Sequence, residues 1–292
     1  MKTIYYFSQC FKELAKYNKA WSEIEAALQS QNEAYGFISC ARDIWARDFM
    51  PFQRHDGGFV IYNYNPDYLQ DEQSKYITDC QDAFRGIGGN PDASNCHQTN
   101  LVIDGGNMIK CQDKNGEPCV VMTAKVLYEN PHLSHHKILS ELEYVLDAEV
   151  IIIPWDASEM YGHADGMVRS VGKGRLLLNC YADMDSELEK VLKKALGSRF
   201  ELHELYYGDK FRENSWCHLN YLELRHAVLI PTASLASDHL ALAQIEEAIG
   251  KKCIPIPMAS VVADGGAMHC VSWSVDAPDA LLDGNAIPLY RE

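Results

Sequence analysis

The sequence contains no Cys-x-x-Cys pair, although it has ten cysteines, and it has no run of about 18 apolar residues. Ten cysteines would form a disulfide framework in a short secreted chain, but here they are scattered over 292 residues. We therefore interpret them as mostly reduced core residues. No apolar segment before Lys12 is long enough for a signal peptide. These absences predict a soluble, cytoplasmic protein.

Basic residues are also few, with 26 Lys and Arg against 41 Asp and Glu and a net charge of −15. This balance disfavours nucleic acid and anionic membranes as partners and favours cationic ligands. The hydrophobic content of 47% can fill a sizeable core. No low-complexity linker divides the chain, so we expect a single domain over residues 1–292. The sequence is compatible with assembly into a homo-oligomer.

One order of elements recurs about every 50 residues: a strand pair, an amphipathic helix and a short apolar strand. The predicted closing strands are 150–155, 202–207 and 253–258. The predicted helices are 134–146, 186–196 and 237–249, and each begins at a serine that could act as N-cap. The predicted strand pairs are 107–111 with 119–123, 166–171 with 175–180, and 221–224 with 227–231.

Partial copies of the same unit occur at the two ends of the chain. A strand at 3–7, a helix at 13–30 and strands at 37–40 and 59–64 fit the start, and residues after Ser260 would supply a final strand pair. We predict an α/β fold in which about five ββαβ units close into a ring, because one such unit cannot bury its own sheet. An ordinary mixed α/β sandwich is the alternative. Residues 65–100 are predicted to form a long loop or insertion near the mouth of the ring.

Four segments carry residues suited to chemistry: 45–51, 104–107, 162–166 and 264–270. Each has an ordinary explanation when taken alone. Trp45 could be a core residue, Asp104 could cap a turn at two glycines, and Cys270 could be one more buried thiol. The segments occupy matching places in successive units, however, so a ring would bring them to one axis.

Brought together, these segments would place a thiol, an imidazole and three carboxylates at one point. Buried carboxylates are costly unless a cation meets them. A guanidinium is such a cation, because it is planar, permanently charged and able to donate to a carboxylate on each edge. Neighbouring glycines would let a substrate approach the backbone closely. The pattern indicates a site for guanidinium chemistry.

These motifs resemble those of the agmatine deiminase and Porphyromonas-type peptidylarginine deiminase family, whose members share the pentein fold, a five-bladed α/β propeller. The pattern Trp-x-Arg-Asp-x-x-Pro is matched at 45–51, Glu-Gly-Gly-Asn at 104–107, Gly-His-x-Asp at 162–165, and Gly-Gly-x-x-His-Cys at 265–270. The four occur in family order. Each motif alone is weak, and the combination is specific.

The resemblance implies a reaction and a set of roles. Cys270 would attack the guanidinium carbon, His163 would act as acid and then base, and Asp48 and Asp165 would hold the guanidinium nitrogens. Further residues implied at the substrate or behind these groups are Trp45, Arg47, Asp104, Asn107, Gly265 and Gly266. The intermediate would be a cationic thiouronium on Cys270. No metal and no organic cofactor is needed.

The sequence departs from the family pattern in ways that leave the substrate open. Asp104 stands where family members usually carry Glu, and Val271 to Val275 replace the Thr and Gln-rich run that typically follows the nucleophile in agmatine deiminases. We expect agmatine as substrate, with free or peptidyl arginine as alternatives, and Arg54 or Arg169 could then pair with a substrate carboxylate. An amidinotransferase, a cysteine amidase and a non-catalytic guanidine-binding protein are further alternatives.

Overall fold

The computed structural model describes residues 2–156, 161–182, 185–208 and 214–277. In this part of the chain, fifteen strands form five separate sheets of three strands each. In spatial order the sheets are β15–β1–β2 (Ser272–Ala277, Lys2–Ser8, Ala34–Ile38), β3–β4–β5 (Phe52–Gln53, Phe59–Asn63, Cys96–Val102), β6–β7–β8 (Ile109–Gln112, Pro118–Thr123, Glu149–Ile153), β9–β10–β11 (Val168–Ser170, Arg175–Asn179, Glu201–Leu205) and β12–β13–β14 (Leu222–Glu223, Ala227–Thr232, Lys252–Pro257).

All five sheets have one topology. The first strand pairs antiparallel with the second, and the second pairs parallel with the third. A parallel neighbour requires a crossover, and helices supply it in each unit. The crossover helices are α1 and α2 (Gln9–Glu13, Asn18–Ser30), α4 (Cys80–Gly86), α5 and α6 (Lys125–Glu129, His135–Leu146), α7 (Ser186–Leu196) and α8 (Asp238–Ile249).

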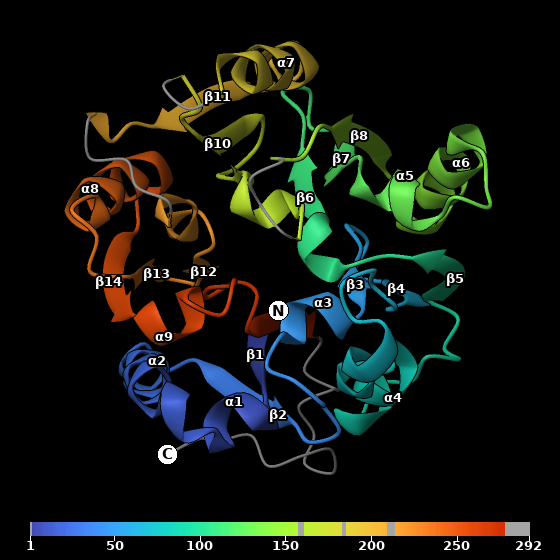
Figure 1. The fold of residues 1–292 in the computed structure, drawn as a ribbon, viewed down its shortest axis with the longest axis horizontal. Helices are drawn as coiled ribbons and strands as arrows, with labels where there is room; N and C mark the ends of the chain where they lie inside the picture. Colours follow the sequence, from blue (N-terminus) through green and yellow to red (C-terminus); the bar gives the residue numbers. More distant parts are fainter. Residues whose placement is uncertain (1, 157–160, 183–184, 209–213, 278–292) are drawn as a thin grey trace.

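Figure 1 shows the five sheets arranged around a common centre, with α2, α4, α6, α7 and α8 on the outside. The described chain runs once around this centre, and its first and last strands pair in one sheet. β1 is antiparallel to β15, with Lys2 opposite Ala277 and Phe7 opposite Ser272. The sequence predicted a final strand pair after Ser260. Up to residue 277 the structure shows instead a short helix α9 (Ala259–Val262) and one strand, β15, whose partner is β1; the rest of the predicted pair lies outside the described residues.

The core lies between the helices and the sheets. In α6 the apolar side chains Ile138, Leu142 and Val145 are buried in the same cluster as Val120 and Met122 of β7. Their spacing of three and four residues places them on one helical face, so burial of this face stabilises the unit. Among the described residues, none of the helices has the length and apolarity to cross a membrane.

Three sequence-based expectations are corrected by the structure. Residues 65–100 do not form one long loop: they include the 3-10 helix η2 (Asp71–Tyr76), α4 and the start of β5, and α4 is the crossover helix of its unit. The helix expected at 13–30 is divided, because η1 (Ala15–Tyr17) separates α1 from α2. Ser134 caps α6 as expected, but α7 is capped by Asp185 rather than Ser186, and the side chain of Ser237 does not cap α8.

Candidate active site

In each unit the segment before the first strand lies at the centre of the molecule. Four of these segments each form one short helical turn. They are α3 (Ala46–Phe49), η3 (Gly105–Asn107), η4 (Ala164–Gly166) and η6 (Ser215–His218). The fifth is the stretch from Ala263 to Val271 before β15. The short elements contact each other, since α3 packs against η3 and η3 against η4. The predicted convergence of the four motif segments is present in the structure.

His163 lies between two carboxylates. Its Nε2 is 2.8 Å from Oδ2 of Asp104, and its Nδ1 is 3.6 Å from Oδ1 of Asp48. The shorter Asp side chain at position 104 therefore reaches the imidazole. Tyr68 adds a hydroxyl that donates to the same Asp104 oxygen at 3.3 Å, and its ring and that of Tyr161 flank His163.

Asp165 and Cys270 form the second half of the site. Oδ2 of Asp165 is 3.7 Å from Sγ of Cys270 and 2.6 Å from Nδ1 of His269. On the other side, Asp48 accepts the backbone N–H of Gly106 at 2.9 Å. A Cβ added to Gly106 would lie 2.7 Å from Asp48 and 2.8 Å from His163, so only glycine fits between the two halves of the site.

Gly265 and Gly266 bring the last segment against Trp45 and Tyr161. Gly265 has φ +90°, in the left-handed region, and a Cβ there would lie 2.6 Å from the Tyr161 ring. A Cβ on Gly266 would lie 2.1 Å from the Trp45 ring. Both glycines therefore allow the aromatic side chains to pack directly on the backbone that leads to Cys270.

A cavity of about 780 Å³ opens onto this group of residues. Six of the sequence-predicted residues line it: Trp45, Asp48, His163, Gly265, Gly266 and Cys270. Tyr68, Leu69, Gln73 and Tyr76 also line it, which places part of residues 65–100 at the mouth, as expected. Asp104 and Asp165 are not among its lining residues; both are 1% exposed and lie directly behind His163 and Cys270.

The electrostatics of the site are set by burial and by the excess of carboxylates. Within the described residues, no Lys or Arg nitrogen forms an ion pair with Asp48, Asp104 or Asp165. Burial raises the pKa of Asp48 to about 7, and the nearby Asp104 and Asp165 add to the rise. Among the residues that the structure describes, His163 is the one cation at ion-pair distance from Asp48 and Asp104, and Arg47 and Arg169 act on Asp165 from farther away.

The pKa values of both reactive groups, His163 and Cys270, are raised. Burial alone would lower the pKa of the His163 imidazole, but Asp48 and Asp104 raise it to about 10, so the ring is protonated at neutral pH. Burial, together with Asp165 and Asp48, raises the pKa of Cys270 well above its usual value, so the side chain is a neutral thiol. For Asp165, burial opposes ionisation, but the hydrogen bond from His269 keeps its pKa below the usual range.

Other predicted residues lie outside the cavity. Asn107 is buried, and its amide oxygen accepts the backbone N–H of Thr123, so it joins η3 to β7. Arg47 accompanies Asp48 in α3, but it lines a different cavity, as does Arg169. Arg54 forms ion pairs with Asp56 and Asp147 at 2.7 and 3.2 Å. Neither Arg54 nor Arg169 is placed to meet a substrate in the cavity beside Cys270.

Two contributors were missed in the sequence. Oδ1 of Asn220 accepts the backbone N–H groups of His269 and Cys270 at 2.9 and 3.1 Å, and this fixes the segment that carries the thiol. Asn220 follows η6, the one central segment without a recognised motif. Its matching place in the repeat was the only signal for it. His269 stands within the Gly-Gly-x-x-His-Cys motif, but sequence reasoning gave it no partner.

The fold and this site define an α/β protein with a thiol, an imidazole and carboxylates gathered at one cavity. The chain belongs to the family of Porphyromonas-type peptidyl-arginine deiminases, whose model matches residues 7–275. Membership in this family supports deimination of a guanidino group, a hydrolysis at a C–N bond. No curated protein matches the sequence.

Solved structures show the same fold at low sequence identity. An agmatine deiminase of C. jejuni is 15% identical, covers 93% of this chain and 92% of its own, and has a TM-score of 0.70. The agmatine deiminase of Enterococcus faecalis is 17% identical, with the same coverage and TM-score. ArgZ is an arginine dihydrolase of cyanobacteria, and a variant of its N-terminal domain was solved covalently bonded to a reaction intermediate. That domain is 12% identical to this chain, and the match covers 95% of this chain and 99% of the domain, with a TM-score of 0.61.

Proposed function

We propose that the chain hydrolyses the guanidinium group of agmatine to N-carbamoylputrescine and ammonia, with Cys270 as nucleophile. The observation that carries this proposal is the cavity in which Cys270, His163 and Asp48 meet. In the part of the chain that the structure describes, no Lys or Arg lies at ion-pair distance from Asp48 or Asp165. A guanidinium supplies the missing positive charge. In this proposal, the five three-stranded units are the blades of a pentein-type propeller around that site.

Binding of the substrate rests on charge and shape. Asp48 would take one edge of the guanidinium and Asp165 the other, since its Oδ2 is only 3.7 Å from Sγ of Cys270. The Trp45 ring on the cavity wall would stack on the guanidinium plane. The bound cation lowers the pKa of the thiol, because positive charge beside Cys270 favours the thiolate. The thiol proton leaves to solvent before the attack.

In the first half of the reaction, the Cys270 thiolate forms a bond to the guanidinium carbon. The C–N bond to one terminal nitrogen then breaks, and protonated His163 gives that nitrogen its proton, so ammonia leaves. The product is a cationic thiouronium on Cys270, stabilised by the same carboxylates. The protonated state that Asp48 and Asp104 impose on His163 is the state this step requires.

In the second half, neutral His163 takes a proton from water, and the hydroxide attacks the thiouronium carbon. The tetrahedral intermediate then collapses: the C–S bond breaks, and the hydroxyl proton passes to the departing sulfur. The neutral Cys270 thiol and the ureido product are released, and His163 keeps the proton for the next turnover. Asp104 would keep the imidazole oriented through both halves, at the 2.8 Å contact with Nε2. A covalent step of this kind is in line with the bonded intermediate in the cyanobacterial domain.

The choice of agmatine rests on the charges around the cavity. Glu13, Asp43 and Asp264 line it, against Lys16 and Arg42, and Lys16 is already paired with Asp264 at 2.9 Å. Burial raises the pKa of Asp43 to about 7, so the acidic excess is complete only where this carboxyl is ionised. That excess suits a second cation on the substrate tail. Arg42 favours the second candidate, free or peptidyl arginine, because its exposed side chain could meet a carboxylate that agmatine lacks.

The test is a substrate panel of agmatine, free arginine and a peptide with a C-terminal arginine, with ammonia and ureido product both measured. We expect equal amounts of the two products, with agmatine turned over fastest. Replacement of Arg42 by Gln should leave agmatine turnover unchanged and should weaken any turnover of arginine. Ureido formation that needs an added amine would indicate an amidinotransferase, and peptide cleavage an amidase. Ammonia from none of the substrates would refute the proposal.

A further inference from the structure

A second cavity, of about 540 Å³, lies among the first strands of the five units. Its lining comes from β1 and β15 and from β3, β6, β9 and β12, the strands that follow the central segments. It shares no lining residue with the cavity beside Cys270. The two cavities are nevertheless back to back, because Arg47 and His269 line one while Asp48 and Cys270 line the other.

This second cavity is cationic in a protein of net charge −15. Five cations line it, Arg47, Lys110, Arg169, Arg225 and Lys251, against the two carboxylates of Glu223 and Asp276. Glu223 is already paired with Lys251 at 2.7 Å, and Asp276 accepts a hydrogen bond from Thr3 at 2.7 Å. The local charge is therefore opposite to that of the molecule as a whole.

Four of the five cations form no ion pair in the part of the chain that is described. Within the described residues, no acidic oxygen lies at ion-pair distance from Arg47, Lys110, Arg169 or Arg225. Arg169 donates to the backbone oxygen of Tyr221 at 3.1 Å and lies over its ring. Asp165 lies near the guanidinium groups of Arg47 and Arg169, and Asp48 lies near that of Arg47, but neither carboxylate is at ion-pair distance. Half-buried guanidinium groups without an ion-pair partner are costly, and charge-assisted hydrogen bonds to an anion would offset that cost.

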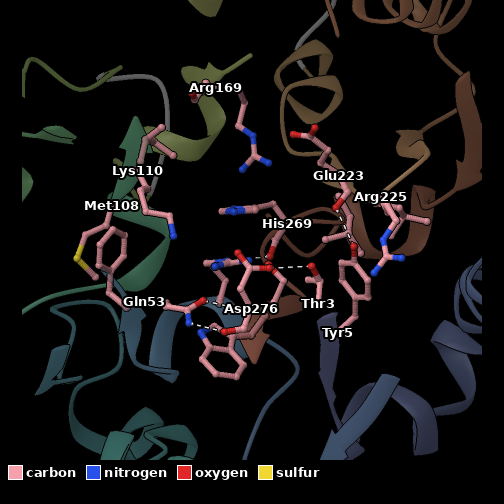
Figure 2. Close-up of a pocket in the computed structure, with 18 of the residues that line it drawn as sticks. Thr3, Tyr5, Gln53, Met108, Lys110, Arg169, Glu223, Arg225, His269 and Asp276 are labelled. Atoms are coloured by element: carbon pink, nitrogen blue, oxygen red, sulfur yellow. Dashed lines mark hydrogen bonds between the residues drawn. The ribbon is translucent and has the colours of Figure 1, made fainter. Parts of the chain in front are cut away.

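The cations converge from different units. Figure 2 shows the charged ends of Lys110 and Arg169 directed into the same space as the His269 ring. Lys110 lies in β6 and Arg169 in β9, while Arg47 enters from α3. Burial and the neighbouring Arg169 lower the pKa of Arg47 to about 10, which reflects how close these positive charges are.

We propose that this cavity is a binding site for a small molecule with an oxyanion group, phosphate or carboxylate, held by Arg47, Lys110 and Arg169. Its volume is within the range of small-metabolite pockets. The site would act on the catalytic centre along two contacts. Nδ1 of His269 is 2.6 Å from Oδ2 of Asp165, and the backbone N–H of Arg47 donates to the backbone oxygen of Cys270 at 3.0 Å.

The experiment is calorimetric titration of the full chain with inorganic phosphate and, separately, with succinate, at constant ionic strength set by chloride. We expect saturable binding of at least one anion, and the tighter of the two identifies the group. Lys110→Gln should weaken the affinity about tenfold, as loss of one charge-assisted hydrogen bond predicts. Lys110 makes no hydrogen bond or ion pair that its replacement would break in the described structure.

Lys190→Gln is the matched control, because Lys190 lies on the outer helix α7 and pairs only with Glu187 there. It should leave the affinity unchanged. Arg169→Gln is the second test variant and should weaken binding like Lys110→Gln. The proposal is overturned if neither phosphate nor succinate binds, or if Lys110→Gln and Arg169→Gln both bind the anion as tightly as the native chain.

Discussion

Asp48 is a carboxylate that is 5% exposed, yet its side-chain partners are one backbone N–H and a histidine. We predict that Asp48→Asn weakens guanidinium binding by about tenfold to a hundredfold, because a charge-assisted hydrogen bond is lost. The affinity should be measured by calorimetry in the Cys270→Ala background, so that turnover does not interfere. In the Cys270→Ala protein that keeps Asp48, the affinity for the guanidinium should also rise as the pH rises through about 7, where the Asp48 carboxyl ionises.

Asp92→Asn provides the control for the loss of one negative charge. Asp92 is 74% exposed, lies outside the cavity and forms an ion pair with Arg85 at 3.8 Å. Its replacement should change guanidinium affinity little and should keep the pH dependence. An equal loss of affinity in Asp92→Asn and Asp48→Asn would mean that net charge, rather than a contact at Asp48, governs binding.

The candidate site could be predicted only in part at the level of single residues. Motifs identified His163, Asp48 and Cys270 because their chemistry is unusual in combination. Asn220 could not be found in this way, since an Asn that holds backbone N–H groups looks like any turn residue in a sequence. Arg169 was one of two candidates to pair with a carboxylate on an arginine substrate, or else a surface cation. β9 directs it into the second cavity, because the face on which a strand residue lies depends on exact register.

At the scale of elements, the N-terminus of α7 gives a sharp test. Oδ1 of Asp185 accepts the N–H groups of Glu187 and Leu188 at 3.2 and 2.9 Å. We predict that Asp185→Ala lowers the free energy of unfolding by about 1 kcal/mol, the usual cost of losing a helix cap. Chemical denaturation with an unchanged m-value would measure it.

Ser186→Ala is the matched variant, since Ser186 is the residue that the sequence pattern favoured as the cap. Its side chain makes no cap hydrogen bond in the structure, so the substitution should change stability by only a few tenths of a kcal/mol. A larger loss in Ser186→Ala than in Asp185→Ala would show that the helix begins one residue later than the structure places it.

The elements themselves were largely predictable. The helices expected at 134–146, 186–196 and 237–249 are α6, α7 and α8 to within one residue, because their apolar spacing is long and regular. The unit containing 65–100 was not recognised, since α4 is only seven residues long and lies in a polar segment. The pairing of β15 with β1 could not be predicted from local sequence patterns either, because the two strands lie more than 260 residues apart in the sequence.

At the scale of the whole molecule, the buried charges of the site predict how stability depends on pH. In the folded protein the pKa of His163 is raised from 6.5 to about 10. The stabilisation that His163 contributes to the folded state is therefore fully present below pH about 6.5 and is lost as the pH rises toward 10. The free energy of unfolding should fall across this interval by a few kcal/mol. The raised pKa of Asp48 acts in the same direction below about 7.

Denaturation of the native chain and of His163→Gln at a series of pH values would measure this effect. Gln keeps a hydrogen-bonding side chain but cannot titrate, so its stability should vary less between about 6.5 and 10. The same slope in both proteins would show that His163 is not held protonated by Asp48 and Asp104.

The central claim is that Cys270 bonds covalently to the guanidinium carbon. It is tested most directly by rapid acid quench of the chain during agmatine turnover, followed by intact-protein mass spectrometry and peptide mapping. We predict an added mass equal to agmatine less ammonia, located on Cys270, present in Cys96→Ala and absent in Cys270→Ala. Ureido product formed by the Cys270→Ala protein at the native rate, or an adduct on another residue, would contradict the account.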